Sequence, residues 1–336
     1  MRGDTSNFPP RPKVRTTRRR GGREAVASGE KCVPRRARSA AVKMRRIPCL
    51  CFRSVISVIV PVRNGMPWLE EQLHALADQR CSEPWEVVVA DNGSTDETRS
   101  VVERWAKRAP VFRLVDASKV KGPGAARNVG VREARGELLA FCDADDIVQP
   151  GWLASHLAAL ASADFVGGAY DYWSLNGLVA PSPPTPSVPS AVSQFGFLPA
   201  VMSGNLAVRR DVFEEAGGFA EDLMTGEDID LSWRIQIRGH RCVINTDAVV
   251  SRRDRNSLPA VFGRFTAYGR CGPLLYRRFR DYGLRRDVVI AAKTWVWLAL
   301  MTPRLLQPRF RSQWVRIAGW RTGRLLESLR QGVFFP

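Results

Sequence analysis

Residues 55–91 read VISVIVPVRNGMPWLEEQLHALADQRCSEPWEVVVAD, and they set the architecture of the chain. The two β-branched apolar runs, at 55–62 and 85–91, have the composition of strands that are buried on both faces of a parallel sheet. Between these runs, Pro67 opens a segment to about Gln79 that predicts a helix. A strand, a helix and a second strand of these lengths predict a βαβ unit with parallel strands.

The same alternation continues toward Asp146. We expect a helix capped by Asp96, strands at 111–116 and 137–146, and a helix at 124–134 between them. After Pro150 the pattern loosens, and the sequence predicts a Pro/Ser-rich surface loop or lid (181–199), a short strand (203–208) and a helix (227–238). The predicted fold class is therefore α/β, with a doubly wound, mostly parallel sheet flanked by helices and a C-terminal helical extension. In such sheets ligands bind beyond the carboxyl ends of the strands.

The composition suits a folded protein whose charge is unevenly distributed. The 336 residues carry 51 Lys and Arg against 33 Asp and Glu, a net charge of +18, and 45% are hydrophobic. Residues 1–53, 54–250 and 251–336 carry +13, −9 and +14, so an acidic block lies between two basic ends. These values exclude an acidic disordered chain, a collagen-like repeat and a polytopic membrane protein. The acidic middle also argues against specific nucleic-acid binding, which only the basic ends would favour.

Cysteine and histidine usage narrows the chemistry further. The seven cysteines form no CxxC pair, which argues against a disulfide framework or a zinc ribbon, and three histidines are too few for a polyhistidine metal centre. A reducing, cytoplasmic setting fits this usage. Arginine supplies 44 of the 51 basic residues, a bias that often accompanies GC-rich coding and favours a bacterial source.

The first 53 residues are rich in Arg, Gly, Pro and Ser and have no apolar periodicity, which predicts a disordered basic extension. No apolar run in them is long enough for a signal peptide. Two interpretations stay open. The extension could bind nucleic acid or anionic lipid, or the biological protein could start at Met44.

The string FCDADD, residues 141–146, places Asp143 and Asp145 two apart at the end of an apolar strand. If the chain turns there, both carboxylates can face one cleft. Paired hard carboxylates suit Mg²⁺ or Mn²⁺, which in turn bind phosphate oxygens. The alternative is a solvated turn after the strand.

Two further strings surround predicted helix starts. In ADNGSTDET (90–98), Asp91 can accept a hydrogen bond from a base or a sugar, whereas Ser94 and its neighbours are explained by helix capping alone. In KGPGAARNVG (121–130), glycines precede a helix that contains Arg127, and amides with an arginine suit a phosphate or a nucleotide. The glycine spacing does not match a dinucleotide fingerprint, which disfavours a nicotinamide cofactor.

A fourth string, TGEDIDLSWRI (225–235), places Glu227 and Asp228 at a predicted helix start. A carboxylate there can act as a general base on an acceptor hydroxyl. The alternative is the ordinary stabilisation of a helix N-terminus by negative charge.

Taken together, these strings resemble the family 2 inverting glycosyltransferases with the GT-A fold. The ordered matches are SVIVPVRNG, ADNGSTDET, GPGAARNVG, FCDADD, SGNLAVRRDVFEEAGGF and GEDIDLSWR, between about Ser54 and Asn245. The resemblance implies an enzyme of the hexosyltransferase type, with a nucleotide sugar as donor and UDP favoured over dTDP or GDP. It also implies a metal-dependent nucleotide-sugar domain over residues 54–250.

The resemblance also implies roles for individual residues. Asp228 matches the base that deprotonates the acceptor, Glu227 its neighbour in the acceptor site, and Asp145 the metal ligand, with Asp143 in the same metal and ribose motif. The remaining matches concern the nucleotide sugar: Pro61, Val62, Arg63 and Asn64 in the first strand and turn, Asp91 and Ser94 at the base, Arg127 beside the diphosphate, and Gly204 and Asn205 under the sugar.

Two departures from the family pattern stand out. Many relatives have a histidine after the strand that follows the acidic helix, whereas this chain has VVSRRDRNS (249–257), with Arg252 and Arg253. Either the metal keeps more waters, or an arginine partly neutralises the diphosphate. The QxxRW motif of processive synthases is also missing from the sequence, so we expect one sugar to be transferred per encounter.

Residues 251–336 are predicted to form a basic, Trp-rich helical extension. The apolar run at 287–302 is shorter than the ~20 residues of a spanning helix, and Lys293 interrupts it. Tryptophans interleaved with arginines favour peripheral contact with an anionic membrane, which would place the protein at the inner face of the plasma membrane. The alternative is that these helices pack on the catalytic domain.

The leading hypothesis is thus a non-processive sugar transferase in cell-surface glycan synthesis, acting on a lipid-linked or polysaccharide acceptor. Two alternatives stay open. A sugar nucleotidyltransferase would need a glycine-rich loop after the first strand, where PVRNG stands instead, and an inactive GT-A-like binding or scaffold protein would explain the missing histidine.

Overall fold

The computed structural model describes residues 55–109, 111–177, 188–189, 191–192, 194–254 and 257–335. The predicted disordered extension and part of the predicted Pro/Ser-rich loop (181–187, 190 and 193) lie outside these residues.

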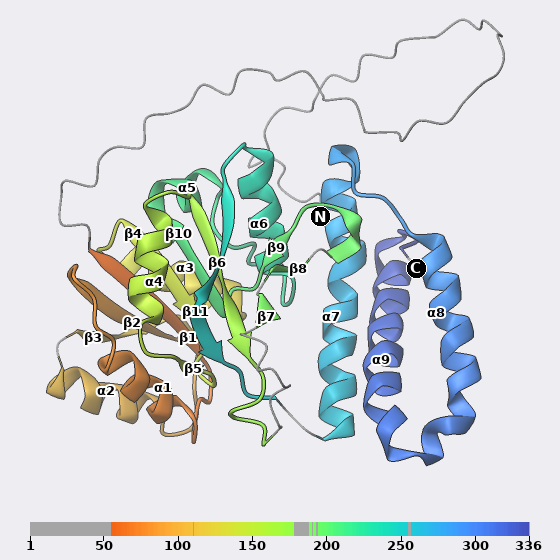
Figure 1. Cartoon of the computed structure of the whole chain (residues 1–336), viewed down its shortest axis with the longest axis horizontal. Helices are drawn as coiled ribbons and strands as arrows, with labels where there is room; N and C mark the ends of the chain where they lie inside the picture. The colour runs from red at the N-terminus through yellow and green to blue at the C-terminus, as the bar shows by residue number, and fades with distance from the viewer. Residues whose placement is uncertain are drawn as a thin grey trace, which may run out of the picture.

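The centre of the molecule is a mixed sheet that has nine strands among the described residues, and Figure 1 shows helices on both of its sides. The first four strands are parallel and lie in the order β3-β2-β1-β4. Their bounds are Ile56–Val62 (β1), Trp85–Asp91 (β2), Phe112–Asp116 (β3) and Leu138–Cys142 (β4). These strands lie within the four predicted apolar runs.

The second half of the sheet mixes directions. Strand β10 (Asn205–Arg209) lies antiparallel between β4 and β6 (Phe165–Asp171), while β11 (Cys242–Ser251) is parallel to β6. Two short strands complete it: β5 (Ile147–Val148) pairs with β11, and β7 (Val188–Pro189) pairs with β6. A separate pair is formed by β8 (Ala191–Val192) and β9 (Ala200–Val201).

Two apolar cores hold the helices against the sheet. On one face pack α1 (Leu69–Ala77), α2 (Thr98–Arg108) and α4 (Trp152–Leu160), with Val58 and Val60 of β1 beneath them. On the other face pack α3 (Pro123–Glu133), α5 (Arg210–Glu215) and α6 (Glu227–Ile237), over Ile59 and Val88. Because side chains alternate along a strand, β1 supplies both cores. The predicted doubly wound arrangement is confirmed.

The C-terminal extension consists of three helices that lie side by side in Figure 1: α7 (Leu258–Phe279), α8 (Val288–Met301) and α9 (Pro308–Gln331). The 3₁₀ turns η2 (Arg280–Tyr282) and η3 (Thr302–Leu306) follow α7 and α8, and η1 (Gln194–Gly196) precedes β9. Helices α7 and α9 pack so closely that a Cβ on Gly269 would lie 2.1 Å from the Trp320 carbonyl oxygen.

The extension is not separated from the sheet domain. Trp233 and Ile229 of α6 share a buried cluster with Leu275 and Phe279 of α7 and with Phe335 near the end of the chain. The predicted boundary after residue 250 therefore marks a change in composition and secondary structure, while the apolar core continues across it.

Candidate active site

The predicted site residues converge on one edge of the sheet. Strands β2, β1 and β4 are adjacent and parallel, so the loops after Asp91, Val62 and Cys142 leave from the same edge. Strand β10 runs antiparallel to β4 with Asn205 opposite Cys142, which brings Gly204 to that edge as well. This placement follows from the strand order alone.

Arg127 of α3 is the centre of the charged network. Its guanidinium donates to Asp143 Oδ1 at 2.7 Å and to Glu227 Oε1 at 2.9 Å, and the side chain is 3% exposed. Burial disfavours its charge, but the carboxylates of Asp143, Glu227 and Asp228 outweigh burial and raise the pKa of Arg127. Arg127 thus joins α3, the loop after β4 and the start of α6 in one permanently cationic centre.

The two acids at the start of α6 have strongly perturbed environments. Burial, and next the charge of Asp228, raise the pKa of Glu227 to about 7, although Arg127 opposes the shift. Burial also raises the pKa of Asp228, against the backbone N–H groups of Ser203 and Ile229, which donate to its carboxylate at 3.2 and 2.8 Å. A carboxylate with a raised pKa is a stronger proton acceptor than an ordinary aspartate.

The acids that follow β4 occupy different environments. Asp143 keeps 32% of its side chain exposed while it holds Arg127, and Asp145 follows in the same turn. Asp146 is 3% exposed, and burial next to the charges of Asp143 and Asp145 raises its pKa well above the usual range. Gly204 lies against Asp143: a Cβ there would be 2.6 Å from Oδ2.

This donor set fits a divalent cation that keeps several waters. Asp143 and Asp145 are half-buried and carry hard oxygen ligands, which suit Mg²⁺ or Mn²⁺. Within the described parts of the chain, no group of three His, Cys, Asp or Glu side chains could enclose a metal. A site closed by protein ligands alone is therefore not formed there, and Asp145 and Asp143 are the residues that would hold the ion.

The loops after β1 and β2 are tied together by polar contacts. The Asn64 side chain accepts from the backbone N–H of Thr95 at 2.8 Å, and the backbone N–H of Asn64 donates to Ser94 Oγ at 2.9 Å. Asp91 is fully buried, accepts from the Ser94 N–H at 3.0 Å and pairs with Arg99 at 2.7 Å. Pro61 and Val62 are buried at the strand end, whereas Arg63 is exposed.

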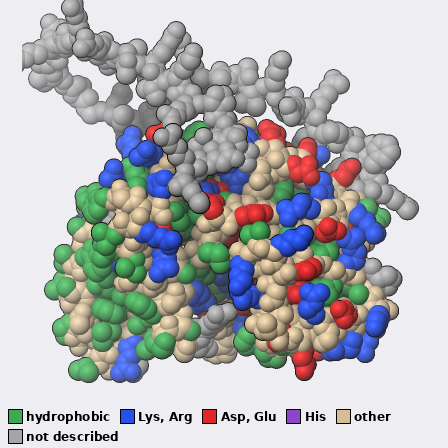
Figure 2. Space-filling model, turned by 180° about the vertical axis from the view of Figure 1, so that it is seen from behind, with side chains coloured by type: hydrophobic (Ala, Val, Ile, Leu, Met, Phe, Trp, Pro, Cys, Tyr) green, Lys and Arg blue, Asp and Glu red, His purple; other side chains and the backbone are tan. Residues whose placement is uncertain are grey.

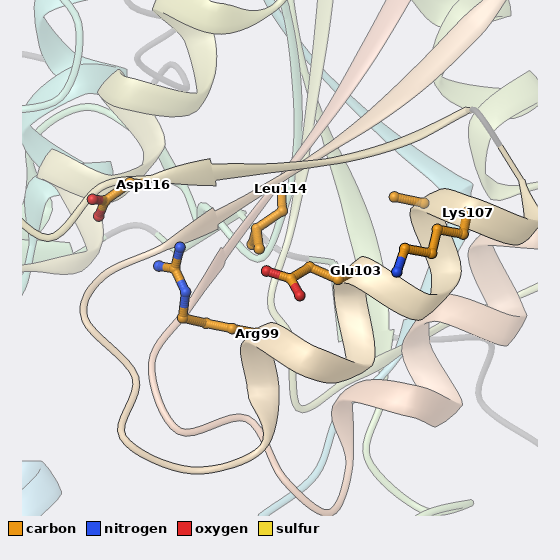
Figure 3. A pocket seen from close by; sticks show the side chains of 6 residues that line it. Arg99, Glu103, Lys107, Leu114 and Asp116 are labelled. Atoms are coloured by element: carbon orange, nitrogen blue, oxygen red, sulfur yellow. The ribbon is translucent and has the colours of Figure 1, made fainter.

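An open cavity of about 600 Å³ borders this part of the site (Figure 3). Residues of α2 and β3 line it, and Arg99 connects it to Asp91. The Arg127 network contributes no lining residue to it. The cavity is therefore distinct from the Arg127 network and adjoins the Asp91 end of the site through Arg99.

Asn205 has a different place from the predicted one. Its side chain is fully buried, donates to the carbonyls of Ala169 and Ala248, and has Trp152 Nε1 and His156 Nε2 at 2.9 Å from Oδ1. These four contacts use its whole hydrogen-bonding capacity, so it has none left for a sugar. The prediction of direct substrate contact is thus not supported, and Asn205 instead positions β10 and, through it, Gly204.

Sequence patterns did not identify the residues of β6 and α7 that lie beside Gly204 and Gly226. Tyr170 of β6 lies under Gly204, with its hydroxyl 2.9 Å from the place of a Cβ, and the Arg252 guanidinium lies over the Tyr170 ring at 5.3 Å from its centre. From α7, Cys271 packs against Gly226, and Ala267 accepts a hydrogen bond from the Thr225 hydroxyl. The departure at 249–257 was the only signal in the sequence that pointed here.

Comparison with known proteins relates this chain to glycosyltransferases. Residues 57–217 match the family described as Glycosyl transferase family 2. Glycosyltransferase AglE of Haloferax volcanii is 28% identical over 201 residues, which are 58% of this chain and 65% of that protein. The putative teichuronic acid biosynthesis glycosyltransferase TuaG of Bacillus subtilis is 33% identical over 96 residues, 28% of this chain and 37% of that protein. The chain thus spans less than two thirds of the length of either relative.

Among solved structures, the chain is similar to the mannosyltransferase PcManGT from Pyrobaculum calidifontis, which was solved in complex with GDP-Man and Mn²⁺. The TM-score is 0.59 at 21% identity, over 84% of this chain and 89% of that one. At this identity the likeness concerns the fold alone, and it confirms the expected GT-A architecture.

Proposed function

Since residues 57–217 of this chain belong to glycosyl transferase family 2, we propose that the protein is an inverting glycosyltransferase that moves one sugar from a nucleotide-diphosphate sugar to an acceptor hydroxyl. The observation that carries the proposal is the Arg127 network, in which buried acids with raised pKa values meet Asp143, the first of two half-buried carboxylates of a type that binds metal. A UDP-sugar is the donor we favour.

The residues divide the reaction between them. Asp228, held by the N–H groups of Ser203 and Ile229, accepts the proton of the acceptor hydroxyl while that oxygen forms a bond to the anomeric carbon. The bond from the anomeric carbon to the diphosphate oxygen breaks, the diphosphate leaves with the electron pair, and the configuration inverts. Asp145 and Asp143 would hold Mg²⁺ or Mn²⁺, which supplies positive charge to the leaving diphosphate.

Release of nucleotide from a donor panel tests this proposal. UDP-, dTDP- and GDP-sugars are offered with Mg²⁺ or Mn²⁺ to the wild type and to the Asp145→Ala variant, and the released nucleoside diphosphate is measured. We expect one nucleotide class to be turned over, with a strong loss in the variant. Nucleotide binding without turnover of any donor, with any acceptor tried, would instead favour a binding protein with a GT-A fold.

The acceptor we propose is a lipid-linked or polysaccharide glycan of the cell surface. The similarity to a teichuronic acid biosynthesis enzyme supports this class. Saccharide acceptors with and without a lipid-phosphate anchor, compared in the same assay, separate the two members of the class.

We also propose that α8 contacts the membrane at the cytoplasmic face. By length and composition the segment Val288–Leu306 could cross a membrane, with 11% of it buried in the fold. Hydrophobic side chains gather on the side of the molecule at the left of Figure 2, and Val289, Val296 and Leu300 of α8 are each more than half exposed. Since α8 alone covers only about 21 Å and η3 turns back into the arginine-rich α9, contact along the surface fits better than crossing.

Liposome flotation tests the membrane contact. The full chain should float with vesicles that contain anionic lipid, and the triple variant Val289→Ser, Val296→Ser, Leu300→Ser should stay in the soluble fraction. Exposed valines elsewhere provide a matched control, for which Val120→Ser is suitable because Val120 is 47% exposed in the loop before α3. Equal flotation of the wild type and the triple variant would disprove the assignment of α8.

A further inference from the structure

One arginine of the site, Arg252, has no acidic partner among the residues that the structure describes. Arg252 follows β11, and its guanidinium lies over the ring of Tyr170, with Nη1 3.4 Å from the sulfur of Met202. Among the described residues no carboxylate forms an ion pair with Arg252, whereas Arg127, Arg253 and Arg99 around the same edge are each paired with an acid. A thioether is a weak acceptor, so the described residues leave most of the donor capacity of Arg252 unused.

The guanidinium of Arg252 lies next to residues of the proposed active site. The hydroxyl of Tyr170 and the carboxylate of Asp143 both lie against Gly204, 2.9 and 2.6 Å from the place of its Cβ. Met202 precedes Ser203, whose N–H holds the Asp228 carboxylate. The guanidinium is thus fixed next to the turn 202–204, which touches both the metal-type carboxylate and the proposed base.

The backbone around Arg252 is held rigidly. Its N–H donates to the carbonyl of Asp171 at 2.8 Å, and the adjacent Ser251 pairs with Ile147, directly after the FCDADD motif. Burial disfavours the charge of Arg252, but the neighbouring Tyr170, Tyr172, Tyr268 and Asp146 raise its pKa above the usual range. The side chain is therefore a preorganised and permanent cation.

We propose that Arg252 binds the phosphate oxygens of the nucleoside diphosphate, and that it neutralises part of the charge on this leaving group when the glycosidic bond to the donor breaks. This inference rests on the proposed function and deepens it. Arginine suits the role because its planar fork can donate two parallel hydrogen bonds to a phosphate. Because this cation belongs to the chain itself, the part of the diphosphate binding that it supplies does not depend on metal.

The test compares equilibrium binding in EDTA, by titration calorimetry, of a nucleoside and its diphosphate. The panel is UDP, dTDP and GDP with the matching nucleosides, and the variants are Arg252→Met and Arg252→Lys. We expect Arg252→Met to weaken diphosphate binding by about tenfold to a hundredfold and to leave nucleoside binding unchanged. Arg252→Lys should keep an intermediate affinity, since it retains the charge without the fork.

Arg209→Met is the matched control. Arg209 is also a partly buried arginine, but it lies at the other end of β10, opposite Leu138, and so at the far edge of the sheet. The Arg209→Met variant loses the same charge as Arg252→Met, and it should bind the diphosphate like the wild type. If Arg252→Met proves unfolded by its thermal melt, Arg252→Lys, which keeps the stem over Tyr170, decides the question through its loss of diphosphate affinity.

The outcomes separate this inference from the proposed function. Wild-type affinity for the diphosphate in both Arg252 variants, in a protein that still turns over a sugar nucleotide, overturns the inference alone. A wild type that binds none of the diphosphates, with or without Mn²⁺, overturns the proposed function and this inference with it. A loss in Arg252→Met equal for nucleoside and diphosphate assigns a merely structural role.

Discussion

Replacing Gly204 by alanine tests directly whether the carboxylate geometry at the sheet edge matters. A Cβ on Gly204 would lie 2.6 Å from Asp143 Oδ2 and 2.9 Å from the Tyr170 hydroxyl. An ordinary contact begins at 3.4 Å, so in close-packed surroundings the Asp143 carboxylate must withdraw by roughly 0.8 Å. Because Asp143 is held 2.7 Å from Arg127, the same movement disturbs the ion pair at the centre of the site.

The size of the effect follows from that displacement. A misplacement of about 1 Å at a reacting group costs on the order of 10²-fold in rate, so we expect kcat/KM to fall by roughly 30-fold to 100-fold. The backbone of Gly204 is not in the left-handed region, so alanine adds no backbone strain, but overpacking against the buried Tyr170 hydroxyl should lower the thermal midpoint by a few degrees. Binding of the free nucleoside should persist, because Asp91, the residue expected at the base, is held by Ser94 and Arg99 and not by Asp143.

Initial rates of nucleotide release from the preferred donor measure this effect. The control is Gly263→Ala, a glycine of α7 whose added Cβ would meet nothing within 4 Å. Activity of Gly204→Ala within about twofold of the control would refute the reasoning, because it would mean that the position of Asp143 is not needed for transfer.

Three further predictions concern the same edge of the sheet. Asp228→Asn should lower transfer by roughly 10²-fold to 10⁴-fold while donor affinity, measured by calorimetry, is retained; near-normal turnover would contradict its role as base. Burial raises the pKa of Glu227 to about 7 and also raises the pKa of Asp228. We therefore expect kcat/KM to fall as the pH drops below about 7, because these acids gain protons. A pH profile that is flat down to pH 5 would speak against a base in this pair. Asn205→Ala leaves buried groups of Trp152 and His156 without their partner. We therefore expect the free energy of unfolding to fall by at least about 3 kcal/mol and the thermal midpoint by roughly 10 °C. An unchanged melt would show that the hydrogen bonds of Asn205 do not stabilise the fold.

The parallel half of the fold could be predicted because its signals are local. The run at 85–91 forms β2 over the same residues, and Pro123 to Glu133 forms the helix expected after the third strand. Each of these elements is bounded by its own turn residues and apolar pattern. The convergence of Asp91 and Asp143 at one edge followed from the parallel βαβ rule.

The pairings between segments that are far apart in the sequence could not be predicted. The insertion of β10 between β4 and β6 depends on contacts across tens of residues, and it is this insertion that gives Asn205 its four partners. The Asp91–Arg99 pair and the placement of Arg252 over Tyr170 likewise depend on side-chain packing that no periodicity encodes. The motif strings therefore predicted which residues lie together at this edge of the sheet, but not the contacts that each side chain makes there.

The shared core between α6 and α7 has a practical consequence for handling the protein. Trp233 is fully buried against Phe279, and Phe335 closes the same cluster beside Tyr276 at a ring distance of 5.2 Å. A shortened chain that stops after β11 would lack Tyr276, Phe279 and Phe335, which would expose the Trp233 ring to water and invite aggregation. An affinity tag fused at the C-terminal end would lie beside the buried Phe335. Affinity tags for purification therefore belong at the N-terminus. The role of the C-terminal helices has to be tested by point substitutions and not by deletions.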